Sequence, residues 1–102
     1  MKNSKNEMQK EYEIRFTARG KRDLDKFRKR YWRSYLDFMT VAPVLKIDPY
    51  GVGRPLKGNC KGLYSLHFGR KPECRALYEI KDYLVVVFVM RIGTRENFYD
   101  IF

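Results

Sequence analysis

The chain of 102 residues is long enough for one compact domain, and its 44% hydrophobic and 16% aromatic residues exclude an intrinsically disordered protein. Lys and Arg number 22 against 12 Asp and Glu, and the resulting net charge of +10 favours a polyanionic partner such as nucleic acid, an acidic protein or a membrane surface. The longest apolar run, Tyr83 to Met90, is too short to span a bilayer, and the polar N-terminus lacks the apolar segment of a secretion signal. We therefore expect a cytoplasmic protein without membrane association.

The first half of the chain predicts a strand followed by a helix. Residues 1–11 are polar and charged and are expected to form a flexible N-terminus, before a single domain over residues 12–102. Residues 12–16 alternate apolar and charged side chains, as a half-buried strand does. Thr17 is the expected N-cap of a long helix that continues to about Met39, with a basic wet side. Its apolar face, at spacings of three and four, comprises Leu24, Phe27, Tyr31, Tyr35 and Phe38.

Pro43 is expected to interrupt any continuing helix and to leave a short second helix or turn over residues 44–47. The segment 48–55 is rich in Gly and Pro and predicts a loop. Three strands with short connections then follow, at residues 62–68, 75–80 and 83–90, and such links favour an antiparallel meander. The predicted fold is α+β, with the long N-terminal helix and the short second helix packed on one face of a twisted, mainly antiparallel four-stranded sheet.

The chemistry available to the chain comes from cations and aromatic rings. The sequence has no paired acids in a motif, no nucleophile elbow and no metal-ligand cluster, so we expect no metal and no cofactor. Cys60 and Cys74 flank one predicted strand, which is compatible with two reduced thiols or with a single bridge. Cations bind phosphates and aromatic rings stack on unpaired bases, a combination that suits single-stranded RNA. The candidate RNA contacts are Lys57, Lys61, Arg70, Lys71, Arg91 and Tyr64.

RNA also supplies its own nucleophile. Cleavage by the 2′-hydroxyl requires that this group lose its proton, that the phosphorane be stabilised and that the 5′-oxygen be protonated; arginines around the phosphate can provide the stabilisation without a metal. The end of the most apolar strand, with Arg91, Gly93, Arg95 and Tyr99, is the predicted floor of such a site, and Gly93 is expected to act as a flexible joint. His67, the one histidine, can serve as acid or base near neutral pH, although a lone strand histidine is more often structural.

The order and spacing of several segments resemble the RelE/ParE superfamily of type II toxins over residues 12–102. These segments are Leu56-Lys57-Gly58, the strand ending near His67, Cys74 to Ile80, the valine-rich strand, and Gly93 to Tyr99. The resemblance implies a helix pair packed on a twisted antiparallel sheet. It also implies one of two activities: RelE members cleave mRNA in the ribosomal A site without a metal, whereas ParE members poison DNA gyrase.

The resemblance assigns roles by position. It implies that Arg75 binds phosphate, that Arg95 stabilises the transition state and helps to protonate the leaving oxygen, and that Tyr99 stacks on or activates the nucleotide. The chain departs from the family where Ser65 and His67 stand in place of lysines. It departs again at Cys74, where an aromatic residue is common, and at Thr94, where several relatives have His or Lys.

Three functions are therefore compatible with the sequence. The first is an endoribonuclease toxin that cleaves mRNA on the ribosome and inhibits translation, with Arg95, Tyr99, Arg75 and His67 as its catalytic residues. The alternatives are a ParE-like gyrase inhibitor and an RNA-binding module without activity. The expected partners of the first are mRNA, the ribosome and a small, acidic, amphipathic antitoxin whose helix covers the apolar edge of the long helix.

Overall fold

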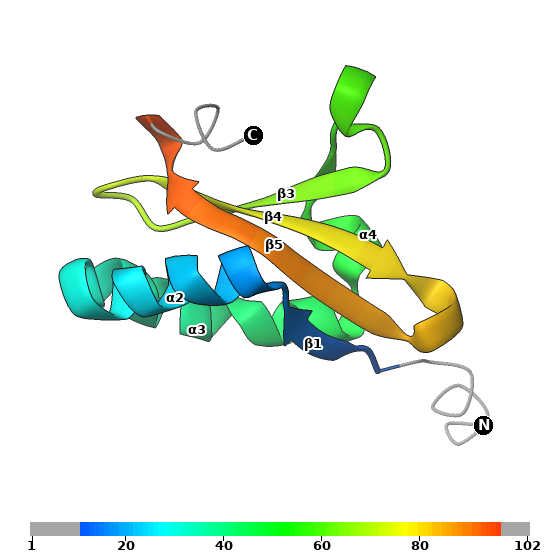
Figure 1. Cartoon of the computed structure of the whole chain (residues 1–102), viewed down its shortest axis with the longest axis horizontal. Coiled ribbons are helices and arrows are strands. Elements are labelled where there is room, and N and C mark those ends of the chain that lie inside the picture. The colour runs from blue at the N-terminus through cyan, green and yellow to red at the C-terminus, as the bar shows by residue number, and fades with distance from the viewer. Residues whose placement is uncertain (1–10, 97–102) are drawn as a thin grey trace.

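Five strands form one mixed sheet in the computed structural model, which describes residues 11–96 (Figure 1). Their order across the sheet is β1-β5-β4-β3-β2, with β1 parallel to β5 and the other pairs antiparallel. The strands are β1 (Glu13–Phe16), β2 (Arg54–Pro55), β3 (Leu63–Phe68), β4 (Cys74–Lys81) and β5 (Val86–Thr94). The predicted α+β class is confirmed. The strand number differs from the predicted four because the two residues of β2, in a segment predicted as a loop, pair with β3.

The long helix is broken at Tyr31. Helices α2 (Ala18–Arg30) and α3 (Trp32–Ile47) meet at this residue, whose backbone leaves the helical region, and a four-residue helix, α4 (Pro49–Val52), follows. The break allows Phe27 and Phe38 to contact the same ring, that of Phe68, at centroid distances of 6.4 and 5.4 Å. In one continuous helix these two residues would lie about 16 Å apart along the axis and could not share that contact.

Pro43 lies inside α3 and does not end it, so the predicted interruption is wrong. A proline in a helix interior costs about 3 kcal/mol because it removes one hydrogen bond and crowds the preceding turn. Its neighbours Ala42 and Leu45 are buried in the core, and the helix closes only at Asp48, whose backbone N–H donates to the carbonyl of Val44. Burial of this last turn outweighs the cost of the proline.

Helix α2 is fixed directly to β5. The Thr17 hydroxyl accepts from the Gly20 N–H at 3.1 Å, which confirms the predicted N-cap, and donates to the carbonyl of Met90 at 3.1 Å. Gly20 is buried against β5, where a Cβ would lie 2.2 Å from the carbonyl oxygen of Val89. Only a residue without a side chain allows this approach.

The core lies between the sheet and the helices, which cover one face of the sheet (Figure 1). Its side chains come from alternate strand residues and from the inner sides of α2 and α3: Phe27, Phe38, Leu45, Leu66, Phe68, Cys74, Ala76, Tyr78, Val87, Val89 and Ile92. The intervening strand residues, among them Ser65, His67 and Arg75, point to the opposite face. We call this opposite side the outer face of the sheet.

Strand β5 begins and ends later than the sequence predicts. Tyr83 and Leu84, predicted as strand, lie in a 3-10 turn (Asp82–Leu84) and are 78% and 52% exposed. Val85 then adopts a left-handed conformation (φ 54°) that turns the chain into the strand. At the other end β5 continues to Thr94, so Gly93 is a strand residue opposite Arg75 and not a joint beyond the strand.

The two cysteines are not bridged: Cys60 is half-buried, and the buried Cys74 thiol donates to the carbonyl of Pro72 at 3.4 Å. Burial raises the pKa of the Cys74 thiol, which keeps it protonated in the core. None of the helices within residues 11–96 is long and apolar enough to cross a membrane.

The turn between β4 and β5 is tied to two distant tyrosines. The Asp82 carboxylate accepts from the Tyr12 hydroxyl at 2.6 Å and from the Tyr50 hydroxyl. These hydrogen bonds, with burial and the charge of Asp82, raise the pKa of both phenols from 10.0 to about 12. The residue preceding β1, the helix α4 and the β4–β5 turn are thereby joined at one carboxylate.

This junction is expected to lose its stabilising effect in alkali. Because the phenol pKa values are higher in the folded state than in the unfolded chain, the stabilisation is complete below pH 10 and disappears as the pH rises from 10.0 through about 12. The measurement is the free energy of unfolding as a function of pH for the wild type and for Asp82→Asn. The variant should show a flatter decline in that window, and identical profiles for the two proteins would contradict the assignment.

Candidate functional site

The register of the sheet places four residues side by side on the outer face: His67, Arg75, Glu73 and Arg95. His67 of β3 is directly opposite Arg75 of β4. The Arg95 N–H donates to the carbonyl of Glu73 at 2.7 Å, which extends the β4–β5 ladder by one residue beyond Cys74 and Thr94. Glu73 precedes Arg75 by two residues and therefore shares its face. Directly opposite strand residues lie about 4.5–5.5 Å apart at Cβ, so these side chains form one cluster.

A β-bulge brings Arg95 to this face. Val87 and Val89 point into the core, and simple alternation would direct Arg91, Gly93 and Arg95 to the same side. Between Leu77 and Tyr78 of β4, however, the register shifts, and β5 contains one extra residue, Met90. The shift reverses the alternation, since Ile92 takes the core position, and it turns Arg95 toward Arg75.

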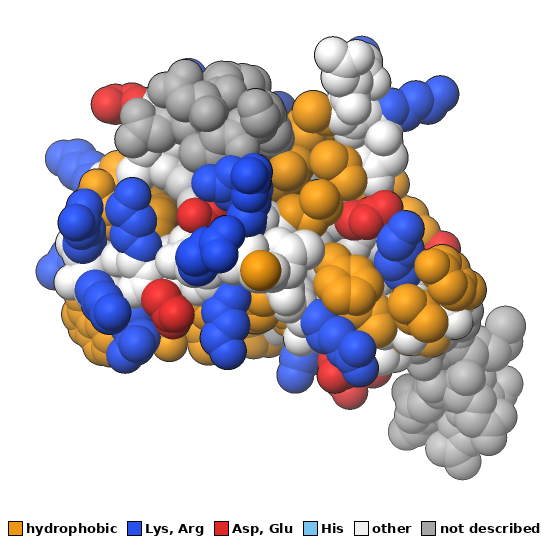
Figure 2. Space-filling model, in the orientation of Figure 1, with side chains coloured by type: hydrophobic (Ala, Val, Ile, Leu, Met, Phe, Trp, Pro, Cys, Tyr) orange, Lys and Arg blue, Asp and Glu red, His pale blue; other side chains and the backbone are white. Residues whose placement is uncertain are grey.

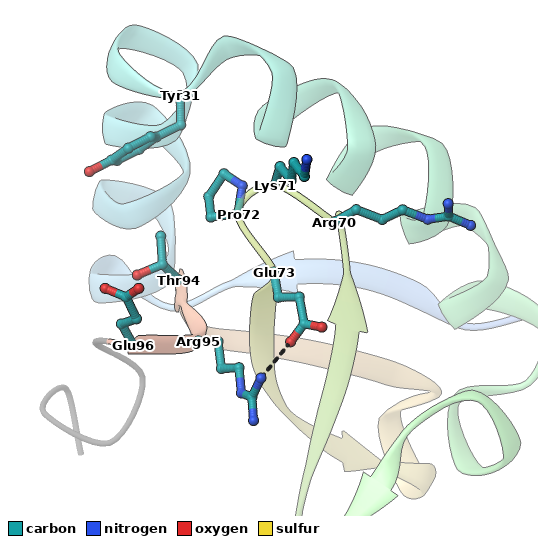
Figure 3. A pocket seen from close by; sticks show the side chains of 8 residues that line it. All are labelled: Tyr31, Arg70, Lys71, Pro72, Glu73, Thr94, Arg95 and Glu96. Atoms are coloured by element: carbon teal, nitrogen blue, oxygen red, sulfur yellow. Dashed lines mark hydrogen bonds and ion pairs between the residues drawn. The ribbon is translucent and has the colours of Figure 1, made fainter.

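Arg95 and Glu73 also contact each other through their side chains. Arg95 Nη1 lies 3.2 Å from Glu73 Oε1, and Figure 3 shows both side chains pointing to the same side of the sheet. The two side chains are 64% and 58% exposed, so the pair is accessible to a ligand from solvent. An ion pair this exposed contributes little to folding stability.

Two pockets meet at Glu73. A small pocket of about 140 Å³ is lined by His67, Arg75 and Glu73, with Phe68, Gly69 and Cys74. A larger one of about 640 Å³ is lined by Tyr31, Arg70, Lys71, Pro72, Glu73, Thr94, Arg95 and Glu96 (Figure 3). Glu73 is the residue common to both. The two pockets therefore adjoin at Glu73.

The surroundings of His67 favour the neutral imidazole in the free protein. Burial lowers its pKa from 6.5, and the nearby charges of Arg75 and Arg54 lower it further, while Glu73 opposes them. A neutral ring can accept a proton, and an anion bound beside Arg75 would favour the protonated form because it offsets the arginine charge. Phosphate bound beside Arg75 is therefore expected to raise the pKa of His67.

The other predicted RNA contacts are spread over the surface. Lys57 and Lys61 are exposed and flank the 3-10 helix Gly58–Cys60. Arg70 and Lys71 line the larger pocket from the β3–β4 turn, but Arg70 extends away from Arg95 (Figure 3). In the orientation of Figure 2, Lys and Arg side chains gather over the part of the molecule that α2 occupies, so basic surface extends beyond the cluster.

Two further predicted residues, Tyr64 and Arg91, are not brought into the cluster. The ring of Tyr64 stacks on that of Tyr78 at 5.6 Å, on the helix side of the sheet. Arg91 Nε donates to Asp23 of α2 at 2.9 Å, and the same carboxylate accepts from the Ile92 N–H at 2.9 Å, so Arg91 is anchored at the edge of β5. Tyr99 lies outside the described residues.

Two cluster residues were missed by the sequence analysis, Arg54 and Glu73. Arg54 is placed by its pairing with Ser65 across β2 and β3, and a two-residue strand leaves no periodic signal. Glu73 lies in the short connection between the predicted strands at residues 62–68 and 75–80. Its position two residues before Arg75 was the available signal, since residues i and i+2 of a strand share a face. Within residues 11–96 no group of three or more His, Cys, Asp or Glu residues could hold a metal ion.

Known proteins share both the sequence pattern and the fold. The chain is 32% identical over 88 residues to Toxin RelG of Mycobacterium tuberculosis (strain ATCC 25618 / H37Rv), a match that covers 86% of this chain and 95% of that protein. The structure of the toxin-antitoxin complex RelBE2 from M. tuberculosis is similar, with a TM-score of 0.67 and 32% identity over 83% of this chain and 99% of that one.

A YoeB/ParE toxin from Agrobacterium tumefaciens shares the fold, with a TM-score of 0.68 at 19% identity over 81% of this chain and 98% of that one. Residues 14–99 match the family described as ParE toxin of type II toxin-antitoxin system, parDE. The match spans the strand β1, the helices and the whole meander with its arginine cluster. The chain therefore belongs to the ParE toxin family, within the RelE/ParE superfamily of type II toxins.

Proposed function

We propose that this toxin is an endoribonuclease that cleaves mRNA on the ribosome and so inhibits translation. The observation that carries the proposal is the convergence of Arg75, Arg95 and His67 on one face of the sheet, beside pockets open to solvent. Arg54 adds a further cation, close enough to influence the titration of His67. Such a cluster fits the negatively charged backbone of a single strand.

The arrangement supports phosphoryl transfer with the RNA 2′-hydroxyl as nucleophile. Arg75 and Arg95 come from adjacent strands and can hold the scissile phosphate from two sides, with the planar N–H geometry that matches phosphate oxygens. Because negative charge grows on those oxygens as the phosphorane forms, fixed guanidinium groups stabilise the transition state more than the bound RNA. His67 lies opposite Arg75, and this proximity to the phosphate-binding arginine supports a role in proton transfer.

The test of the proposal is the fate of mRNA in a translating extract that receives the purified toxin. Cleaved mRNA with normal DNA supercoiling would support an endoribonuclease. The family description also names parDE, which favours gyrase inhibition as the second candidate. That function predicts intact mRNA and blocked supercoiling, so the two assays run side by side separate the candidates.

We also propose that a small acidic antitoxin binds along α3. This helix exposes a row of apolar residues over four turns, here called the α3 stripe: Trp32, Leu36, Met39, Pro43 and Ile47. Trp32 is 56% exposed and Ile47 67%, an unusual degree for large apolar side chains. A partner helix with an apolar face and acidic flanks would cover the stripe and meet the basic surface, and the related RelBE2 structure is a toxin-antitoxin complex.

Leu36→Lys is expected to weaken antitoxin binding by about 10- to 100-fold, because it places an unpaired charge in the centre of an apolar contact. The measurement is the dissociation constant of the complex with the antitoxin encoded next to the toxin. Leu84→Lys is the matched control, since Leu84 is an exposed leucine in the β4–β5 turn, outside the stripe. Equal affinity of the Leu36 variant and the wild type would place the antitoxin elsewhere.

A further inference from the structure

We propose that Glu73 is the general base of the cleavage reaction and that His67 is its general acid, an assignment that rests on the proposed endoribonuclease function. Neither the sequence pattern nor the family resemblance pointed to Glu73. The structure places it at the junction of the two pockets, paired with Arg95 and on the same face as Arg75.

The position of the carboxylate is fixed at two points. The Glu73 carbonyl accepts from the Arg95 N–H at 2.7 Å, and its Oε1 contacts Arg95 Nη1 at 3.2 Å. A guanidinium has five N–H donors, so Arg95 can hold the carboxylate with one nitrogen and a phosphate oxygen with others. Arg95 would then bind the scissile phosphate and at the same time orient Glu73, as a third group orients the base in other catalytic sites.

Glu73 and His67 lie on two sides of Arg75. His67 is opposite Arg75 across β3 and β4, Glu73 is two residues from it along β4, and all three line the small pocket. A phosphate bound at Arg75 would therefore have a carboxylate on one side and an imidazole on the other. In-line displacement needs one proton acceptor at the attacking oxygen and one proton donor at the leaving oxygen, on opposite sides of the phosphorus.

The proton balance follows from this geometry. The Glu73 carboxylate takes the proton of the 2′-hydroxyl as the bond from O2′ to phosphorus forms. The bond from phosphorus to O5′ breaks, and O5′ takes a proton from the His67 imidazolium. The products are a 2′,3′-cyclic phosphate and a 5′-hydroxyl. After product release Glu73 gives its proton to water, and the neutral His67 takes up a proton from water when the next phosphate binds at Arg75.

The charge change on RNA binding favours proton transfer from His67. In the free protein, burial and the charges of Arg75 and Arg54 lower the pKa of His67, which favours the neutral imidazole. A phosphate bound at Arg75 offsets the arginine charge and so favours the imidazolium. The bound RNA thus favours the protonation state of His67 from which its proton transfer starts.

The test is Glu73→Gln, which keeps the shape of the side chain and a carbonyl oxygen for Arg95 but cannot take up the proton. We expect single-turnover cleavage to fall by about 10²–10⁴-fold, the usual contribution of a general base. Binding of an RNA analogue with a 2′-deoxy sugar at the cleavage position should stay the same or become tighter. The matched control is Glu13→Gln, which removes the same charge from another exposed, arginine-paired carboxylate, on β1 at the far edge of the sheet, and is expected to cleave at the wild-type rate.

A second variant tests whether Glu73 acts as a general base or has only a structural role. Glu73→Ala should be inactive, and added formate should restore cleavage in proportion to its concentration, because a free carboxylate can occupy the vacated space. Wild-type rates for Glu73→Gln, faster cleavage by it, or equal losses of binding and rate would each overturn the assignment while leaving the nuclease in place. A wild-type toxin that leaves mRNA intact would instead overturn the proposed function and this assignment with it.

Discussion

Arg95→Ala is expected to slow mRNA cleavage by about 10²–10³-fold, the loss that follows from removing one donor that stabilises transition-state charge. Arg95 is accessible to an incoming phosphate, since its side chain is 64% exposed and borders the larger pocket. Its side-chain contact with Glu73 would be lost as well, so the variant loses the phosphate ligand and the orientation of the neighbouring carboxylate together. The measurement is the single-turnover rate on programmed ribosomes.

The fold should be unaffected by this change. A substitution at an exposed position without buried contacts usually alters stability by less than about 0.5 kcal/mol, so thermal unfolding of Arg95→Ala should match the wild type. Arg15→Ala is a control of the same chemistry, because Arg15 is an exposed arginine of β1 at the far edge of the sheet. Similar losses of rate in both variants would indicate a general effect of net charge and not a site at Arg95.

Gly20→Ala is expected to destabilise the protein although the same change stabilises most helices. In an ordinary helix interior, alanine is favoured over glycine by about 0.5–1 kcal/mol. Here the new Cβ would lie 2.2 Å from the carbonyl oxygen of Val89, so α2 must move away from β5. Overpacking of this kind costs about 1–3 kcal/mol, which lowers the melting temperature of a domain this size by roughly 5–25 °C.

The control for Gly20 is its neighbour Lys21, an exposed residue of α2. Lys21→Ala changes a surface position of the same helix and should leave the melting temperature within about 4 °C of the wild type, since such changes alter stability by less than about 0.5 kcal/mol. If Gly20→Ala melted at or above the wild-type temperature, the close contact between α2 and β5 would be absent in solution. The placement of β5 relative to the helices would then need revision.

The elements that the sequence predicts well are those with strong periodicity. Alternation in residues 62–68 and the apolar run before Met90 located β3 and β5 to within a few residues. The break at Tyr31 could not be predicted, because it contains no Gly or Pro and arises from the shared contact of Phe27 and Phe38 with Phe68. The prediction that Pro43 would interrupt the helix failed for a similar reason, because burial of Leu45 maintains the helix beyond the proline.

The candidate site was predictable in part. Placing His67 and Arg75 on adjacent antiparallel strands was sufficient to expect them to be neighbours, and the register confirms that they face each other. The approach of Arg95 depends on the bulge at Met90, which alternation alone does not show. Arg54 and Glu73 come from a two-residue strand and a strand end, and only the hydrogen-bond register assigns them to the outer face.

The chemistry of the RNA ends tests the account most directly. Total RNA from a translating extract, treated with the wild-type toxin and with Arg95→Ala, can be examined for new 5′-hydroxyl and 2′,3′-cyclic phosphate termini within coding regions. The account predicts that both termini accumulate with the wild type and are about 10²–10³-fold rarer with the variant. Intact mRNA at toxin concentrations that block supercoiling by gyrase would contradict it.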